Sequence, residues 1–180
     1  TLSVDRLQDP ATRREYLETI VNETERLTRL LDNVLDFSRI ERGQKEYRLE
    51  PTLLADVVER CARILAYPLA QHGFRLRVDV ADDVPRVAAD RDALQQAVLN
   101  LLTNAMKYSG ESRDIDLRLH RLNGEAVIDV TDRGAGISAA HRAHVTEKFY
   151  RVPSAENVGI PGTGLGLTLV EHIAVAQSID

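Results

Sequence analysis

The spacing of hydrophobic residues near the start of the chain predicts one long amphipathic helix. Residues 11–42 contain neither glycine nor proline, Asp9-Pro10 supplies a cap and a favoured first residue, and Gly43 supplies a stop. Apolar or small residues recur in alternating steps of four and three from Ile20 to Ser38, which is the spacing of a coiled-coil seam. Neighbouring apolar residues widen the stripe as in a helix bundle, namely Leu17, Val21, Leu30, Leu35 and Phe37. We expect part of a helical hairpin that forms a homodimer through Leu17 to Ser38, although a long core helix fits the same pattern.

Beyond Gly43 the pattern changes to short strands that alternate with helices. Residues 74–80 alternate with period two, and Asn123-Gly124 is typical of a hairpin turn. Strands are predicted at 47–49, 74–80, 87–89, 114–120 and 126–131, and helices at 51–66, 91–106, 138–144 and 164–177. Residues 151–163, which hold two prolines and two glycines, are expected to form a mobile loop. The order predicts an α+β fold, a two-layer α/β sandwich that follows a boundary near residues 41–45.

Composition narrows the class of protein without naming a function. The chain has 180 residues and a single cysteine, Cys61, which excludes an internal disulfide framework. Its net charge of -5 argues against bulk electrostatic binding of nucleic acid, although a local site could still hold a small anion. No apolar run approaches the ~18 residues that a membrane span needs.

One face of the helix predicted at 91–106 carries candidate chemistry. Asn100, Asn104 and Lys107 are spaced by four and three residues, so they share that face. An amide oxygen can bind Mg²⁺, and a lysine can meet a phosphate. A solvated helix face remains the alternative.

Two glycine-rich segments follow. Asp132 precedes Gly134 and Gly136 directly after a predicted strand, and its carboxylate could accept a hydrogen bond from an exocyclic amine such as that of adenine. A dinucleotide-binding turn and an ordinary glycine turn are the alternatives. Residues 162–167 place three glycines before a predicted helix, where backbone amides can bind phosphate, but the lysine of a P-loop is missing.

Together these segments resemble the catalytic ATP-binding domain of sensor histidine kinases, a fold shared with the gyrase and mismatch-repair ATPases. Residues 100–109 resemble the N box of that family, 132–137 its first glycine box, 148–151 its F box and 162–167 its second glycine box. Residues 31–41 resemble the second helix of the dimerisation and phosphotransfer domain. The resemblance implies that residues 1–42 belong to the helical hairpin and 43–180 to the ATP-binding domain, without its C-terminal hairpin.

The resemblance also implies roles. Asn104 would bind Mg²⁺ with Asn100 as a second candidate, Lys107 would contact the terminal phosphates, and Asp132 would read the adenine amine. Residues 149–163 would form a lid. The implied ATP site comprises Asn100, Asn104, Lys107, Tyr108, Asp132, Gly134, Gly136, Ile137, Phe149, Arg151, Gly162, Thr163, Gly164, Leu165, Gly166 and Leu167. Because asparagine cannot act as the glutamate base of the related hydrolytic ATPases, Asn100 favours transfer to a protein acceptor over transfer to water.

None of the five histidines lies in the acceptor motif of the family, so we expect the acceptor upstream of Thr1 and no autophosphorylation by these residues alone. The implied function is the kinase core of a two-component sensor, which uses Mg-ATP and relays the phosphoryl group to a response regulator. We expect it in the cytoplasm, with membrane contact only through parts outside this chain, and without direct binding of nucleic acid. A degenerate kinase-like scaffold and a serine kinase of the anti-sigma type are the alternatives.

Overall fold

The computed structural model describes residues 9–153 and 162–177. The chain divides into two compact units, Thr1–Lys45 and Glu46–Asp180. No helix among the described residues is both long enough and apolar enough to cross a membrane.

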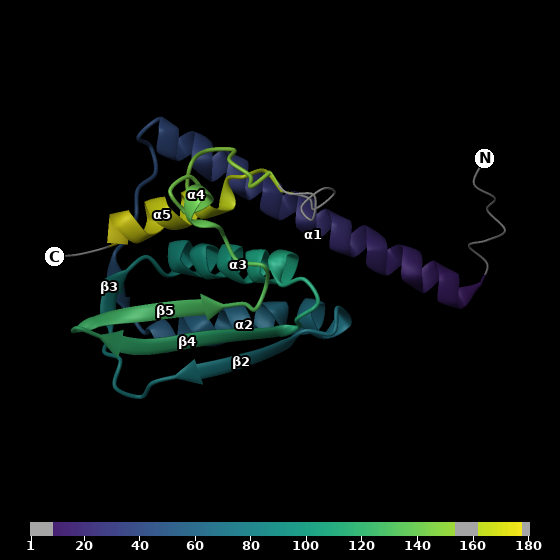
Figure 1. Ribbon diagram of the computed structural model, residues 1–180, viewed down its shortest axis with the longest axis horizontal. Helices are drawn as coiled ribbons and strands as arrows, with labels where there is room; N and C mark the ends of the chain where they lie inside the picture. The colour runs from purple at the N-terminus through teal and green to yellow at the C-terminus, as the bar shows by residue number, and fades with distance from the viewer. Residues whose placement is uncertain (1–8, 154–161, 178–180) are drawn as a thin grey trace. The chain divides into compact units, whose positions relative to one another are not determined.

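The first unit consists of one helix, α1 (Pro10–Glu41) (Figure 1). The Asp9 side chain caps it and accepts hydrogen bonds from the backbone N–H and the hydroxyl of Thr12, at 2.9 and 2.7 Å. After the helix ends, Lys45 returns to Asp36 in an ion pair of 2.7 Å. Apolar side chains of the predicted seam stay exposed, with Ile20 60% and Leu31 62% accessible. Such a stripe requires a partner surface if it is to leave water.

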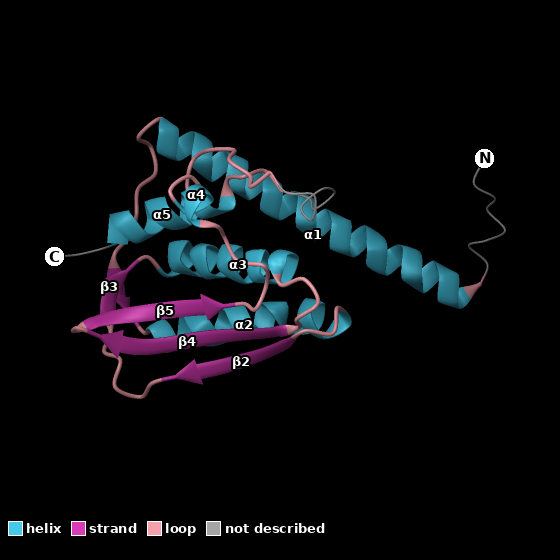
Figure 2. Ribbon diagram, in the orientation of Figure 1, coloured by secondary structure: helices cyan, strands magenta, loops and turns pink. Residues whose placement is uncertain are grey.

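The second unit has a three-stranded sheet with helices on one side of it, as Figures 1 and 2 show. Strand β2 (Arg75–Val80) runs parallel to β4 (Asp114–Leu122), and β4 runs antiparallel to β5 (Glu125–Thr131). A separate pair joins β1 (Glu50–Thr52) to β3 (Val87–Ala89). The helices are α2 (Leu54–Gln71), α3 (Arg91–Tyr108), α4 (Ala139–Arg142) and α5 (Gly166–Gln177). This mixed architecture agrees with the predicted α+β sandwich.

The core lies between the sheet and helices α2 and α3. Alternate residues of β4 (Ile115, Leu117 and Leu119) are at most 1% exposed and belong to one cluster with Val58 of α2 and Leu102 of α3. Cys61 is fully buried in the same cluster, and this burial raises the pKa of its thiol to about 11. A smaller cluster joins α5 to α3 through Ile173, Ala93 and Ala97, with Tyr47 packed against it.

Several predicted elements match the structure, whereas one predicted strand and several predicted helix bounds were wrong. Strand β3 and the hairpin turn are confirmed; Asn123 and Gly124 have φ of 53° and 91°, as a primed turn requires. Residues 47–49 do not form a strand, because pairing with β3 begins at Glu50.

Pro51 does not open a helix. It lies within β1 opposite Ala88, in a pair of only two strands where a missing N–H is tolerated. Helix α2 instead starts at Leu54 and continues past the predicted end at residue 66, through Pro68. The buried Leu65 and Leu69 explain this extension, since packing outweighs the cost of a proline near the helix end. The last helix starts at Gly166 rather than at residue 164, where φ is +73°.

Candidate functional site

Helix α3 positions the asparagines. Asp90 caps the helix by accepting a hydrogen bond from the Ala93 N–H at 2.9 Å, and the opposite side of the helix enters the core. Asn100 and Asn104 are half-buried, whereas Lys107 and Tyr108 in the last turn are exposed. The predicted row of two amides and an ammonium therefore runs along one face from partly covered to open.

The first glycine segment packs directly on the end of α3. Asp132 follows β5, and its Oδ1 accepts a hydrogen bond from the Gly134 N–H at 2.8 Å. A Cβ added at Gly134 would lie 2.0 Å from the carbonyl oxygen of Tyr108, so only glycine allows this approach. Gly136 has a φ of +70°, a conformation that glycine adopts without strain. The following Ile137 is exposed.

The second glycine segment meets the F-box residues. The Phe149 N–H donates to the Gly164 carbonyl at 3.1 Å, and a Cβ at Gly164 would lie 2.6 Å from the Phe149 carbonyl carbon. Thr168 in α5 ties the same region through its hydroxyl, which donates to the Thr146 carbonyl at 2.8 Å. Phe149 itself is 64% exposed, and its backbone has a positive φ of 61°.

The other predicted residues in and near this segment differ in how deeply they are buried. Leu165 is buried, and its N–H meets the Thr163 hydroxyl at 3.4 Å. Leu167 is half-buried, and Arg151 and Gly162 are exposed. Of the predicted lid and mobile loop, residues 154–161 lie outside the described part of the chain.

The start of α5 lies against the asparagines of α3. A Cβ added at Gly166 would be 3.8 Å from Asn100 Oδ1 and 3.9 Å from Asn104 Nδ2. The two glycine segments, from distant parts of the sequence, thus both meet helix α3, the first at Tyr108 and the second at Asn100 and Asn104. A helix N-terminus and a lysine favour an anion, and the Asp132 carboxylate favours a hydrogen-bond donor.

The residues fit magnesium only in the form of a metal shared with phosphate. Within residues 9–153 and 162–177, no group of three or more His, Cys, Asp and Glu side chains could hold a metal ion. Mg²⁺ commonly takes only one or two protein ligands and completes its shell with phosphates and water. An asparagine oxygen beside a helix N-terminus, an end that favours anions, satisfies that pattern.

The sequence motifs did not reveal three further contacts around the site. The Tyr47 hydroxyl meets His172 Nδ1 at 3.0 Å, and His141 Nδ1 meets the Tyr150 hydroxyl at 2.6 Å beside the F-box residues. Arg133 donates to Asp116 at 2.8 Å. Of the three contacts, only that of Arg133 could have been found from the sequence, because the hairpin turn fixes which residue of β4 faces the end of β5.

Comparison with known proteins decides the family. Residues 89–178 match the family described as "Histidine kinase-, DNA gyrase B-, and HSP90-like ATPase", and residues 1–43 match the "His Kinase A (phospho-acceptor) domain". The chain belongs to the sensor histidine kinases. The second match favours this family over the serine kinases of the anti-sigma type.

Individual sensor histidine kinases and related sensory proteins support the assignment. Drug sensory protein A of Synechocystis is 33% identical over 89% of this chain, which spans 26% of that protein. Sensor-like histidine kinase SenX3 of Mycolicibacterium smegmatis is 31% identical over 92% of this chain, which spans 43% of that protein. Full-length ShkA in complex with AMPPNP superimposes with a TM-score of 0.72 at 26% identity, over 91% of this chain and 34% of the ShkA chain. The chain thus spans less than half the length of each of these three proteins.

Proposed function

We propose that this chain is the kinase core of a two-component sensor, which binds Mg-ATP and phosphorylates a histidine outside these residues. The observation that carries the proposal is the contact between Gly166 at the start of α5 and the two amides of Asn100 and Asn104. It combines an anion-binding helix end with oxygen ligands for a divalent cation. Family membership and the AMPPNP bound to ShkA agree with it.

Each part of the nucleotide has a matching group. Asp132 Oδ2 would accept a hydrogen bond from the adenine amine, while Oδ1 is held by the Gly134 N–H. Lys107 and the N-terminal amides of α5 would hold the terminal phosphates. Asn104, with Asn100 as the second candidate, would bind Mg²⁺, which neutralises charge on the phosphates when bound.

In the transfer step, a histidine nitrogen would attack the terminal phosphorus, a P–N bond would form, and the bond to the bridging oxygen would break to release ADP. Asn100 lacks a basic carboxylate, so it cannot activate water in competition with that histidine. The five histidines of the chain lie at residue 72 and beyond, and none lies in α1. The acceptor would therefore come from another segment or another chain.

The remaining assignments follow from the family. We propose that α1 contributes to a homodimer through its exposed apolar stripe and that a response-regulator receiver domain accepts the phosphoryl group. The proposed location is the cytosolic part of a sensor.

A binding experiment tests the site. ATP affinity is measured by titration calorimetry with and without Mg²⁺ for the wild type, Asp132→Asn and Asn104→Asp. Asp132→Asn should bind ATP about 10- to 100-fold more weakly, because it loses a charged hydrogen-bond acceptor. Asn104→Asp should change how strongly the ATP affinity depends on Mg²⁺. Asp129→Asn, which removes a carboxylate from the outer face of the sheet, is the matched control. Unchanged affinity in both site variants would contradict the proposal.

A labelling experiment tests transfer. A longer protein that includes an acceptor helix should gain phosphate that is labile in acid and stable in alkali. If that protein binds Mg-ATP but never becomes labelled, the scaffold alternative replaces the kinase.

A further inference from the structure

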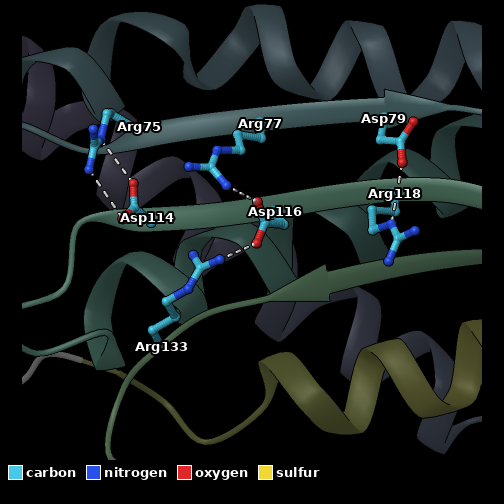
Figure 3. Close-up of polar contacts among 7 residues, drawn as sticks. All are labelled: Arg75, Arg77, Asp79, Asp114, Asp116, Arg118 and Arg133. Atoms are coloured by element: carbon cyan, nitrogen blue, oxygen red, sulfur yellow. Dashed lines mark hydrogen bonds and ion pairs between the residues drawn. The ribbon is translucent and has the colours of Figure 1, made fainter.

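The outer face of the sheet carries a row of paired charges. Register places Arg75 opposite Asp114, Arg77 opposite Asp116, and Asp79 opposite Arg118 (Figure 3). The first pair is 2.9 Å apart and the third 3.4 Å. The second is longer at 4.0 Å, because Asp116 makes its close contact with a different arginine.

That arginine is Arg133, which lies outside the strands. It belongs to the loop after β5 and reaches back so that its terminal nitrogen lies 2.8 Å from Asp116 Oδ2 (Figure 3). The register of the hairpin explains the direction, because Asp116 stands opposite Thr131 and Arg133 is the next residue of the same parity. The intervening Asp132 has the opposite parity and lies between two fixed residues, because strand pairing holds Thr131 and the ion pair holds Arg133.

The arginine of this contact is less exposed than the arginines of the three pairs between β2 and β4. The Asp116 side chain is 20% exposed and that of Arg133 is 46% exposed. Within the loop, Asp132 makes a local polar contact, because it accepts a hydrogen bond from the Gly134 N–H two residues away. The Arg133–Asp116 pair instead joins the loop to a strand whose neighbouring residues, Ile115 and Leu117, are fully buried.

We propose that Arg133 is a positioning residue for base recognition: its ion pair with Asp116 holds the first glycine segment so that the Asp132 carboxylate meets the adenine amine. The proposal rests on the proposed function, in which Asp132 reads adenine. Arg133 itself need not touch the nucleotide, since its guanidinium is engaged on the outer face of the sheet.

The test compares ATP with inosine triphosphate, in which an oxygen replaces the exocyclic amine. Both ligands carry the same triphosphate, so the ratio of their dissociation constants cancels any general loss of positive charge. Asp132→Asn should abolish most of the preference for ATP. Arg133→Gln and Asp116→Asn should each lower it by about two- to fivefold, the range of a partly exposed ion pair. The double variant should lose no more than either single one, because both changes break the same contact.

Two controls separate positioning from general destabilisation. Arg75→Gln breaks the neighbouring pair with Asp114 and should leave the preference for ATP unchanged. Arg133→Lys keeps a charge that can reach Asp116 and should restore most of the preference.

The outcomes separate the two proposals. If ATP does not bind, or if Asp132→Asn keeps the preference, the proposed function fails. If Asp132→Asn loses the preference but Arg133→Gln keeps it, or if Arg75→Gln lowers it equally, the role of Arg133 is overturned.

Discussion

An alanine at position 134 would probe the closest approach in the candidate site. The added Cβ would lie 2.0 Å from the Tyr108 carbonyl oxygen and 2.8 Å from its carbonyl carbon, whereas real Cβ atoms stay at least 3.0 Å away. The carbon must therefore move by about 1 Å, and because both obstacles are backbone atoms, either the loop or the last turn of α3 must shift. Overpacking of this kind costs about 1–3 kcal/mol.

Urea unfolding followed by circular dichroism measures this cost, and ATP titration measures its effect on the site. Gly134→Ala should lower the free energy of unfolding by about 1–3 kcal/mol and weaken ATP binding, because Asp132 shares the displaced loop. Gly136→Ala meets no atom within 4 Å but has a φ of +70°, so about 1–2 kcal/mol of backbone strain is expected. Gly162→Ala has neither obstacle and should stay within about 0.5 kcal/mol of the wild type. If Gly134→Ala unfolds at the same urea concentration as Gly162→Ala, the close approach has been misjudged.

Three further substitutions test other parts of the second unit, each by urea unfolding. Tyr47→Phe removes the hydroxyl that meets His172 and should cost about 0.5–1.5 kcal/mol. Asp90→Ala removes the cap of α3 together with the acceptor for the Arg48 N–H, at an expected cost of about 1–2 kcal/mol. Because burial raises the pKa of Cys61 from 9.0 to about 11, unfolding free energy should fall between pH 9 and 11 by about 2–3 kcal/mol more in the wild type than in Cys61→Ala.

The sign of the cysteine effect follows from proton binding. Below pH 9.0 the Cys61 thiol keeps its proton in both the folded and the unfolded state, and its full contribution to stability is present. As the pH rises from 9.0 through about 11, the unfolded chain loses this proton before the folded protein does, so the free energy of unfolding falls. Equal pH profiles for wild type and Cys61→Ala would refute this.

Tyr67→Phe and Asp92→Ala, at exposed positions, are the controls for the other two substitutions. A cost as small as theirs for Tyr47→Phe or Asp90→Ala would show that the named hydrogen bonds contribute nothing.

Local signals in the sequence predicted the elements that depend on local physics. The turn at Asn123-Gly124 was predictable because few residues adopt positive φ, and the shared face of Asn100 and Asn104 because helical spacing is fixed. The start of β1 was not predictable, since Pro51 fits a helix start as well as a short edge strand.

Contacts between residues distant in the sequence could not be predicted from the motifs. The approach of Gly166 to Asn100 depends on how α5 packs on α3, through residues such as Ile173. The meeting of Tyr47 with His172 joins positions 125 residues apart, and no periodicity encodes it. The pairing of Arg133 with Asp116 is partly predictable, because the register of β4 and β5, once known, places these two residues on the same face of the sheet.

Helix α5 joins three contacts along one element. Its first residue, Gly166, lies near Asn100 and Asn104, His172 in its middle contacts the Tyr47 hydroxyl, and Gln177 at its end accepts a hydrogen bond from the Asp90 N–H. The first two of these contacts are about 9 Å apart along the helix axis, and neither proline nor a second glycine weakens the helix between them. We therefore expect that a substitution which shifts α5 at Tyr47 or Asp90 also shifts Gly166, because the helix moves as one rigid element.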